Sequence, residues 1–206
     1  MENCLKLNFT TNLHKPTLDL DRMRILKDGF TSYTPEYILA DEAMNQFQSM
    51  GLEPTLVLAF KSKQEIKRTH LDIGMDSSGN WRKYLFGINW EVDGSLNEFL
   101  WIKLDDSVQG WYPQPGGLWE HNQEYKTFNS LFFGETRNSP GIPEKSTIIE
   151  RCKVDAIPLL VRTNIPHYTV MTDGPKQRLG FSVRFDESKF KDWDDVVQFF
   201  KPYELI

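Results

Sequence analysis

Two stretches of this 206-residue sequence carry side chains that together can bind a metal ion. The first, RTHLDIG at positions 68–74, places His70 and Asp72 two residues apart. Residues at i and i+2 of a β-strand project to the same side, so both side chains can point at one ion. The second, RTNIPHYTV, places His167 directly after a run typical of a buried strand. If both stretches belong to one β core, they supply two imidazoles and one carboxylate.

Two neutral imidazoles and a carboxylate on one face of an ion form the 2-His-1-carboxylate arrangement of non-haem Fe(II) oxygenases. The open positions on the opposite face accommodate a bidentate 2-oxo acid and O₂. Arg178 follows His167 by eleven residues, at the start of the next expected strand. Its planar, permanently charged side chain is a candidate to hold the distal carboxylate of that acid. Arg184 has the same strand parity and is a second candidate, although the spacing from His167 favours Arg178.

The pair His70 and Asp72 is weak evidence by itself, because aspartate is common and the chain has only four histidines. A polar turn after a strand explains the pair equally simply. The order of His-x-Asp, a second histidine and then an arginine favours the metal site.

The elements that must position these residues are mostly short strands. From about residue 55, runs rich in β-branched and aromatic residues alternate with Gly, Asp, Asn and Pro. These runs are TLVLAFK, KYLFGINWEV, EFLWIKL, TIIERCKV, IPLLVRT and RLGFSVRF. SSGN (77–80) and VDGS (92–95) are typical of hairpin turns. The pattern predicts a mainly β fold with flanking helices, built as an antiparallel sandwich or barrel.

We expect one domain over residues 1–206, since this length buries a substantial single core. An N-terminal strand and helices should occupy 1–54, including a helix that starts at Thr34-Pro35 and ends at Gly51. The β core should span 55–186, with a long irregular insert at about 105–145. A closing helix should lie within 187–206, with Trp193, Val196, Val197 and Phe200 on one face.

Charge and composition restrict the expected cellular location and the classes of binding partner. The formal net charge of −5 gives no bulk electrostatic reason to expect nucleic acid or an anionic membrane as a partner. No run approaches ~18 consecutive apolar residues, and the N-terminus lacks the apolar run of a signal peptide, so a soluble, cytoplasmic protein is expected. Cys4 and Cys152 lie outside any C-x-x-C pattern and make neither a disulfide framework nor a zinc-ligand set. Nothing in the sequence determines the oligomeric state.

Other candidate site residues carry less specific signals. Asn89 in GINW can contact the cosubstrate or satisfy backbone groups within its strand. Trp90 and Trp101 are candidate substrate contacts, although core packing is the default for tryptophans on strands. Tyr112 and His121 lie in the expected insert and are further candidates for substrate contact.

The sequence resembles the Fe(II)/2-oxoglutarate-dependent dioxygenases with a double-stranded β-helix (jelly-roll) core. It is most similar to their aspartyl/asparaginyl β-hydroxylase and proline-hydroxylase-like branch. The likeness rests on THLD, GINWEVDG and RTNIPHYTV…QRLGFSVRF, and covers about residues 52–186. It implies Fe(II) at His70, Asp72 and His167, with 2-oxoglutarate at Arg178 and O₂ as the other cosubstrate. Asp72 and His167 are 95 positions apart, which is longer than compact members of this branch show.

The resemblance implies hydroxylation or desaturation, because halogenases of this family replace the carboxylate ligand with a small residue and Asp72 is present. The expected substrate is an unactivated C–H of an amino-acid side chain, free or in a peptide, or of a small metabolite. The products would include succinate and CO₂. Two alternatives stay open: a non-catalytic jelly-roll ligand-binding module, which would not bind iron, and a cupin-like metalloenzyme, which would bind metal but not use 2-oxoglutarate.

Overall fold

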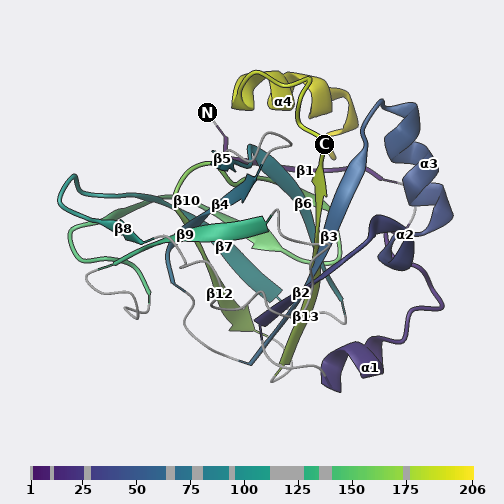
Figure 1. Cartoon of the computed structure of the whole chain (residues 1–206), viewed down its shortest axis with the longest axis horizontal. Coiled ribbons are helices and arrows are strands. Elements are labelled where there is room, and N and C mark those ends of the chain that lie inside the picture. The colour runs from purple at the N-terminus through teal and green to yellow at the C-terminus, as the bar shows by residue number, and fades with distance from the viewer. Residues whose placement is uncertain are drawn as a thin grey trace.

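The computed structural model describes residues 2–9, 12–25, 29–63, 68–75, 81–92, 96–111, 128–134, 141–173 and 177–206. These residues form two antiparallel β-sheets with helices along one side and across one end (Figure 1). The predicted mainly β, antiparallel architecture is therefore confirmed. Among the described helices, none is both long and apolar enough to cross a membrane.

The first sheet contains, in order of pairing, β1 (Cys4–Lys6), β11 (Leu159–Arg162), β6 (Phe86–Val92), β13 (Gln177–Phe185), β3 (Pro54–Lys63) and β2 (Gly29–Tyr33). The second sheet contains β10 (Thr147–Val154), β7 (Leu96–Lys103), β12 (His167–Asp173), β4 (His70–Met75), β9 (Phe128–Phe133) and β8 (Gly110–Trp111). Strand β5 (Trp81–Lys83) pairs with β4.

Four strand pairs are nested inside one another along the chain. Strand β3 pairs with β13, β4 with β12, β6 with β11, and β7 with β10. The innermost pair is closest in sequence and each outer pair is further apart. This nesting makes β4 and β12 neighbours, and their register is defined by one pair, His70 opposite His167.

The two faces of the first sheet differ in chemistry because successive strand residues point to opposite sides. The outer face is apolar, and Ile88, Phe181 and Phe185 pack there in one core cluster with residues of the helices. The inner face is polar, and Asn89 and Ser182 are both buried on it. Both faces of β6 are buried along its whole length. A polar inner face of this kind can serve a binding site between the sheets.

Helices α1 (Leu20–Ile25), α2 (Pro35–Ile38) and α3 (Asp41–Ser49) lie on one side of the sheets, and α4 (Trp193–Phe200) crosses one end (Figure 1). The predicted helix ending at Gly51 is interrupted at Leu39 and Ala40, both of which are extended. The Ala40 N–H donates to the Leu13 carbonyl, and Leu39 bridges His14. Pairing with this N-terminal segment therefore breaks the helix in two. Helix α4 lies where the sequence predicts it, capped by the Asp192 side chain.

Two expectations about connections are wrong. The insert at about 105–145 contains β9, which pairs with β4 from His70 to Gly74, so this part of it belongs to the second sheet. The turn VDGS joins β6 to β7, which lie in different sheets, so it does not close a hairpin between paired strands. Residues 112–127 and 135–140 of the insert, and the turn SSGN, lie outside the described residues.

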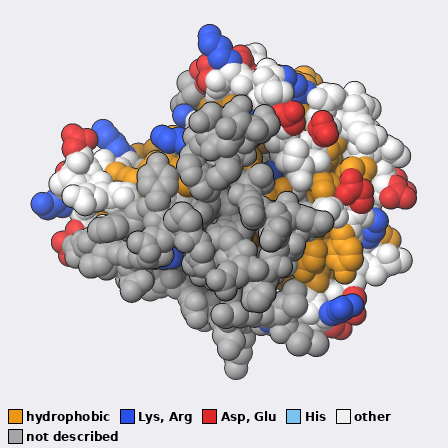
Figure 2. Space-filling view, viewed as in Figure 1, with side chains coloured by type: hydrophobic (Ala, Val, Ile, Leu, Met, Phe, Trp, Pro, Cys, Tyr) orange, Lys and Arg blue, Asp and Glu red, His pale blue; other side chains and the backbone are white. Residues whose placement is uncertain are grey.

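The surface in Figure 2 carries both signs of charge. Among the described residues of this face, Lys and Arg side chains are interspersed with Asp and Glu side chains (Figure 2). Apolar side chains gather on the side where α2 and β2 lie, and Tyr33 and Tyr37 stack there with ring centroids 5.2 Å apart (Figure 2).

A buried carboxylate fixes the start of β6. Glu187 follows β13, is 4% exposed, and accepts hydrogen bonds from the backbone N–H groups of Leu85 and Phe86 at 3.0–3.2 Å. Burial raises the pKa of Glu187 to about 7, against the opposing effect of those hydrogen bonds. The folded protein therefore holds a proton on Glu187 more tightly than the unfolded chain does.

This linkage makes stability depend on pH in a defined direction. Well below pH 4.5, Glu187 is protonated in both the folded and the unfolded protein. Above pH 4.5 the unfolded chain loses this proton first, so the free energy of unfolding falls as the pH rises to about 7. Glutamine in Glu187→Gln does not titrate. Between pH 4 and pH 8, the unfolding free energy of the wild type should therefore fall by about 3 kcal/mol more than that of Glu187→Gln. Urea denaturation of both proteins across this range measures the difference. A difference that stays constant with pH would contradict the prediction.

Candidate metal centre

His70, Asp72 and His167 converge on one point of the structure. One potential ligand atom from each lies within 4.8 Å of the other two. Asp72 Oδ1 is 3.7 Å from Nε2 of His70 and 3.8 Å from Nε2 of His167. These separations are too long for hydrogen bonds. They fit within two metal–ligand bonds of about 2.1 Å placed end to end, so the three side chains can bind a metal ion together.

The pairing of β4 with β12 brings the three residues together. His70 and His167 are directly opposite each other across these strands, and their ring centroids are 4.4 Å apart. Asp72 lies two residues along β4, on the same face as His70. The triad therefore depends on one cross-strand register rather than on a flexible loop.

Hydrogen bonds to the backbone set the orientation of both imidazoles. Nδ1 of His70 lies 2.8 Å from the carbonyl oxygen of Arg68, and Nδ1 of His167 lies 2.9 Å from that of Ile165. A carbonyl oxygen only accepts, so each Nδ1 must carry the proton and donate it. Each Nε2 then presents its lone pair toward the triad. Metal-binding histidines in proteins are oriented by partners of this kind.

The environment of His167 keeps its imidazole neutral. The side chain is 2% exposed and stacks on Phe99, with centroids 4.7 Å apart and planes inclined by 24°. Burial, with a further contribution from His70, lowers the pKa of His167 to about 3. A metal ion binds the neutral form of imidazole, so His167 needs no deprotonation before binding at neutral pH.

Arg184 fixes the carboxylate of Asp72. Its Nη2 donates to Asp72 Oδ2 at 2.6 Å, and both side chains are less than 5% exposed. Oδ2 is thereby engaged from the first sheet, while Oδ1 faces the two histidines. The geometry favours binding of an ion through one oxygen of Asp72.

A glycine gives the Arg184 guanidinium its space. Gly87 lies on β6 beside Arg184, and a Cβ there would be 1.4 Å from Arg184 Nη1. Any larger residue at position 87 would displace the guanidinium from Asp72. Gly87 therefore helps to position the Asp72 carboxylate.

The backbone of Asp72 is anchored at the junction of the two sheets. Its N–H donates to the Thr163 carbonyl at 3.1 Å, and its carbonyl accepts from the Tyr84 N–H at 3.0 Å. Thr163 in turn donates its hydroxyl to the Tyr84 carbonyl. These hydrogen bonds fix the backbone of Asp72 in position between the two sheets.

His70 is the most exposed of the three triad residues. The His70 side chain is 20% exposed, compared with 4% for Asp72 and 2% for His167. An ion held here would be shielded on the His167 side, where Phe99 covers the ring.

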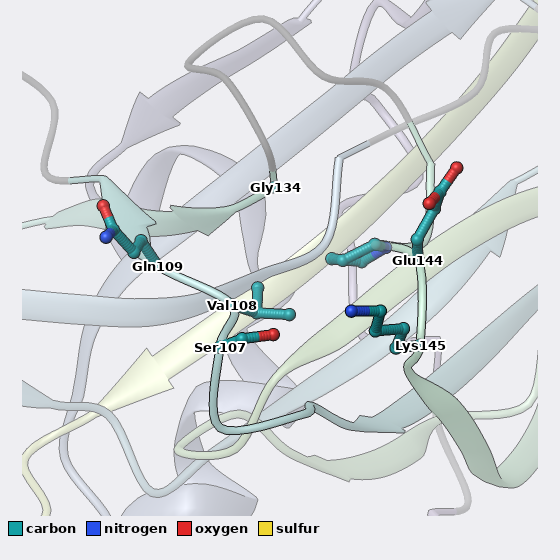
Figure 3. A pocket seen from close by; sticks show the side chains of 7 residues that line it. Ser107, Val108, Gln109, Gly134, Glu144 and Lys145 are labelled. Atoms are coloured by element: carbon teal, nitrogen blue, oxygen red, sulfur yellow. The ribbon is translucent and has the colours of Figure 1, made fainter.

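Two surface cavities do not include the triad among their lining residues. One of about 460 Å³ lies where the segment Ser107–Gln109 faces Glu144 and Lys145 (Figure 3). The Lys145 side chain extends toward that segment, whereas the Glu144 carboxylate points away from it (Figure 3). The other, about 380 Å³, is lined in part by His14 and Trp90.

The remaining predicted site residues lie in different environments. Asn89 faces the inner side of the first sheet, where its Oδ1 accepts from the Ser182 hydroxyl. Trp90 lies on the opposite face, packed on Phe181 and donating to His14 Nδ1 at 3.2 Å. The structure therefore does not bring Trp90 to the triad.

Trp101 is fully buried and donates its Nε1–H to the Arg162 carbonyl at 2.8 Å. It is opposite His167 across β7 and β12, and its ring packs on Phe99. Trp101 thus packs on Phe99, the residue on which the His167 ring stacks. The backbone of Arg178 lies on β13 opposite Ser62, but its side chain, like Tyr112 and His121, lies outside the described residues.

Sequence inspection missed Phe99 and Gly87 as parts of this site. Phe99 appears only as one apolar residue of a strand, and its contact with His167 depends on the register of β7 with β12. Gly87 lies inside a strand, between the large apolar residues Phe86 and Ile88. A glycine inside a strand often marks a close approach by another group, and this was the signal available.

No protein-family model matches the chain, and no curated protein matches it significantly.

Removing one ligand should abolish tight metal binding. We expect His167→Ala or Asp72→Ala to weaken the affinity for Fe(II) or Co(II) by at least about 100-fold, since loss of an outer partner alone weakens binding 10- to 100-fold. Anaerobic calorimetric titration measures the affinity. His14→Ala is the matched control, because His14 contacts Trp90 on the far face of the first sheet. Equal losses in all three variants would contradict the assignment of the site.

Gly87→Ala should weaken metal binding without removing any ligand or charge. We expect a loss of about 10- to 100-fold in affinity, because the new Cβ displaces Arg184 from Asp72. Gly180→Ala is the matched control, since a Cβ there would instead meet the Glu91 carboxylate at 2.6–2.7 Å. The same titration applied to both variants checks this prediction. An affinity unchanged by Gly87→Ala would show that Arg184 does not position Asp72.

Proposed function

We propose that this protein is an Fe(II)/2-oxoglutarate-dependent oxygenase that hydroxylates an unactivated C–H bond. The observation that carries the proposal is the convergence of two Nε2 lone pairs and one carboxylate oxygen, each oriented by a separate hydrogen bond. Nitrogen and oxygen donors in this 2-His-1-carboxylate set suit a ferrous ion and leave adjacent positions open. When bound, the iron would supply O₂ activation coupled to decarboxylation of 2-oxoglutarate to succinate and CO₂.

The chain's own residues divide the remaining tasks. His70 and His167 bind as neutral ligands, with tautomers set by the carbonyls of Arg68 and Ile165. Asp72 offers Oδ1 to the ion while Arg184 keeps Oδ2 in a hydrogen bond. Phe99 and the buried surroundings of His167 exclude water from one side of the ion.

We assign the distal carboxylate of 2-oxoglutarate to Arg178 rather than Arg184. Arg184 is already bonded to Asp72, which makes it a poor partner for a second carboxylate. Arg178 lies on the same strand, β13, at the same parity as Arg184. The same inner face carries the buried Ser182 on β13 and its partner Asn89 on the neighbouring strand β6, which supports a polar binding surface for the cosubstrate.

The nested strand pairing supports a double-stranded β-helix as the fold. In a jelly roll, eight strands pair first with eighth, second with seventh, third with sixth and fourth with fifth, because a long hairpin is wound into two sheets. Strands β3, β4, β6, β7, β10, β11, β12 and β13 follow this order. In this scheme the two histidines belong to the second and seventh strands, which are partners.

The proposed substrate is an amino-acid side chain, free or in a peptide, or a small metabolite. The support comes from the resemblance of THLD, GINWEVDG and RTNIPHYTV…QRLGFSVRF to the aspartyl/asparaginyl and proline-hydroxylase-like enzymes. The triad itself does not distinguish among these substrates.

Anaerobic titration with Fe(II) and 2-oxoglutarate tests the proposal directly. Wild-type protein should develop the weak visible charge-transfer band of 2-oxoglutarate bound to Fe(II). Arg178→Ala should need about 10- to 100-fold more 2-oxoglutarate for the same band, because a hydrogen-bonded charge is lost, with Fe(II) affinity unchanged. Arg151→Ala is the matched control, since this arginine is exposed on β10.

The outcomes separate the competing functions. Fe(II) binding without the band would favour a metalloenzyme that does not use 2-oxoglutarate. Folded protein that binds no Fe(II) would favour a ligand-binding module. Succinate formation that depends on O₂ and Fe(II), and is abolished in Asp72→Ala, would support the oxygenase.

A further inference from the structure

The two cysteines of the chain meet where the edges of the two sheets come together. Cys4 lies on β1, the edge strand of the first sheet, and Cys152 lies on β10, the edge strand of the second. They are 148 positions apart in the sequence. Spacing alone gives no reason to pair them, but the fold places them together.

Both thiols are free, and both are partly buried against the same apolar cluster, which contains Phe99 and Val154. Both side chains therefore occupy one protected position between the sheets.

Neighbouring polar contacts hold the two edge strands in this position. The Glu150 carboxylate, two residues before Cys152, accepts from the Asn3 backbone N–H at 3.0–3.1 Å and from the Asn3 side chain at 2.7 Å. Glu150 Oε1 also lies 3.8 Å from the Cys4 sulfur. These contacts fix the strand that carries Cys4 against the strand that carries Cys152.

The two thiols differ in acidity. The hydrogen bond with Cys152, burial and nearby acidic groups raise the pKa of Cys4. The hydrogen bond from Cys4 lowers the pKa of Cys152, and Lys6 contributes in the same direction against the effect of burial. Cys152 is therefore the thiol that ionises first, and the thiolate is the reactive form of cysteine.

We propose that Cys4 and Cys152 form a redox-modification site that a hydroperoxide converts into an intramolecular disulfide. The Cys152 thiolate attacks the terminal peroxide oxygen, which forms an S–O bond, breaks the O–O bond and leaves a sulfenic acid. Cys4 then loses its proton and attacks the Cys152 sulfur, which forms the S–S bond and releases water. With hydrogen peroxide, two thiols are oxidised by two electrons in total, and the peroxide is reduced to two water molecules.

This disulfide would tie the two sheets together at one edge and close a long loop in the unfolded chain. Cross-links that close long loops stabilise a protein mainly by restricting the unfolded ensemble. The oxidised protein should therefore resist denaturation more than the reduced protein. The proposal does not depend on the chemistry of the metal centre.

The first test compares native and denatured protein. Reduced, metal-free protein is treated with hydrogen peroxide, with and without denaturant, alkylated, and digested without reductant for mass spectrometry. We expect a Cys4–Cys152 linkage to form at least ten times faster in the native protein than in the denatured protein. Dithiothreitol should reverse the linkage, and the linked protein should have a higher midpoint of unfolding. Persistent alkylation of both thiols, disulfide-linked dimers, or equal rates in the two states would overturn the proposal.

Single variants test the roles of the two thiols. With Cys4→Ser, peroxide should leave a sulfenic acid at Cys152 that reacts with dimedone, because the resolving thiol is absent. With Cys152→Ser, Cys4 should react at least ten times more slowly than Cys152 does in Cys4→Ser, because burial and the nearby acidic groups still raise the pKa of Cys4. Equal reactivity in the two variants would contradict the assignment of Cys152 as the attacking group, and the wild-type comparison applies even if a variant does not fold.

Discussion

The buried contact between Arg184 and Asp72 is the interaction on which the arrangement of the site depends. It joins a strand of each sheet, and neither side chain has more than a few per cent of its surface exposed. Burying a lone carboxylate destabilises a protein strongly, so Asp72 requires a compensating positive charge wherever it is placed in this core. Arg184 supplies that charge from the facing sheet, and Gly87 gives it the space to do so. The position and orientation of the Asp72 side chain therefore depend on how the two sheets pack against each other.

The two histidines are oriented by a different and more local device. Each donates its Nδ1 proton to the carbonyl two residues earlier in its own segment, so the ring direction follows from the backbone path. The pairing of β4 with β12 then places the Nε2 atoms of both rings near Asp72 Oδ1. Local hydrogen bonds determine the direction of the ligands, and long-range strand pairing determines their position.

Much of the strand content and the three triad residues could be predicted from the sequence, because alternating apolar runs and residue chemistry are local signals. The separation of β6 from β7 into different sheets could not, since the turn VDGS looks the same whether the flanking strands pair or not. The interruption of the helix at Leu39 depends on a bridge to His14, which is distant in sequence. The partner of Arg184 likewise depends on which inner-face positions of the two sheets meet. In each case the missing information is register between segments far apart in the chain.

The nested strand order also has a consequence for how the protein folds. His70 and His167 belong to an outer pair of the nest, so their strands meet only after the chain has closed a loop of nearly half its length. Closing such a loop costs conformational entropy before its contacts form, which makes pairings of this kind slow. The inner pair, β7 with β10, closes a much shorter loop. The triad residues are therefore expected to come together late in folding, so that a metal ion would bind the completed core rather than nucleate the collapse of the chain.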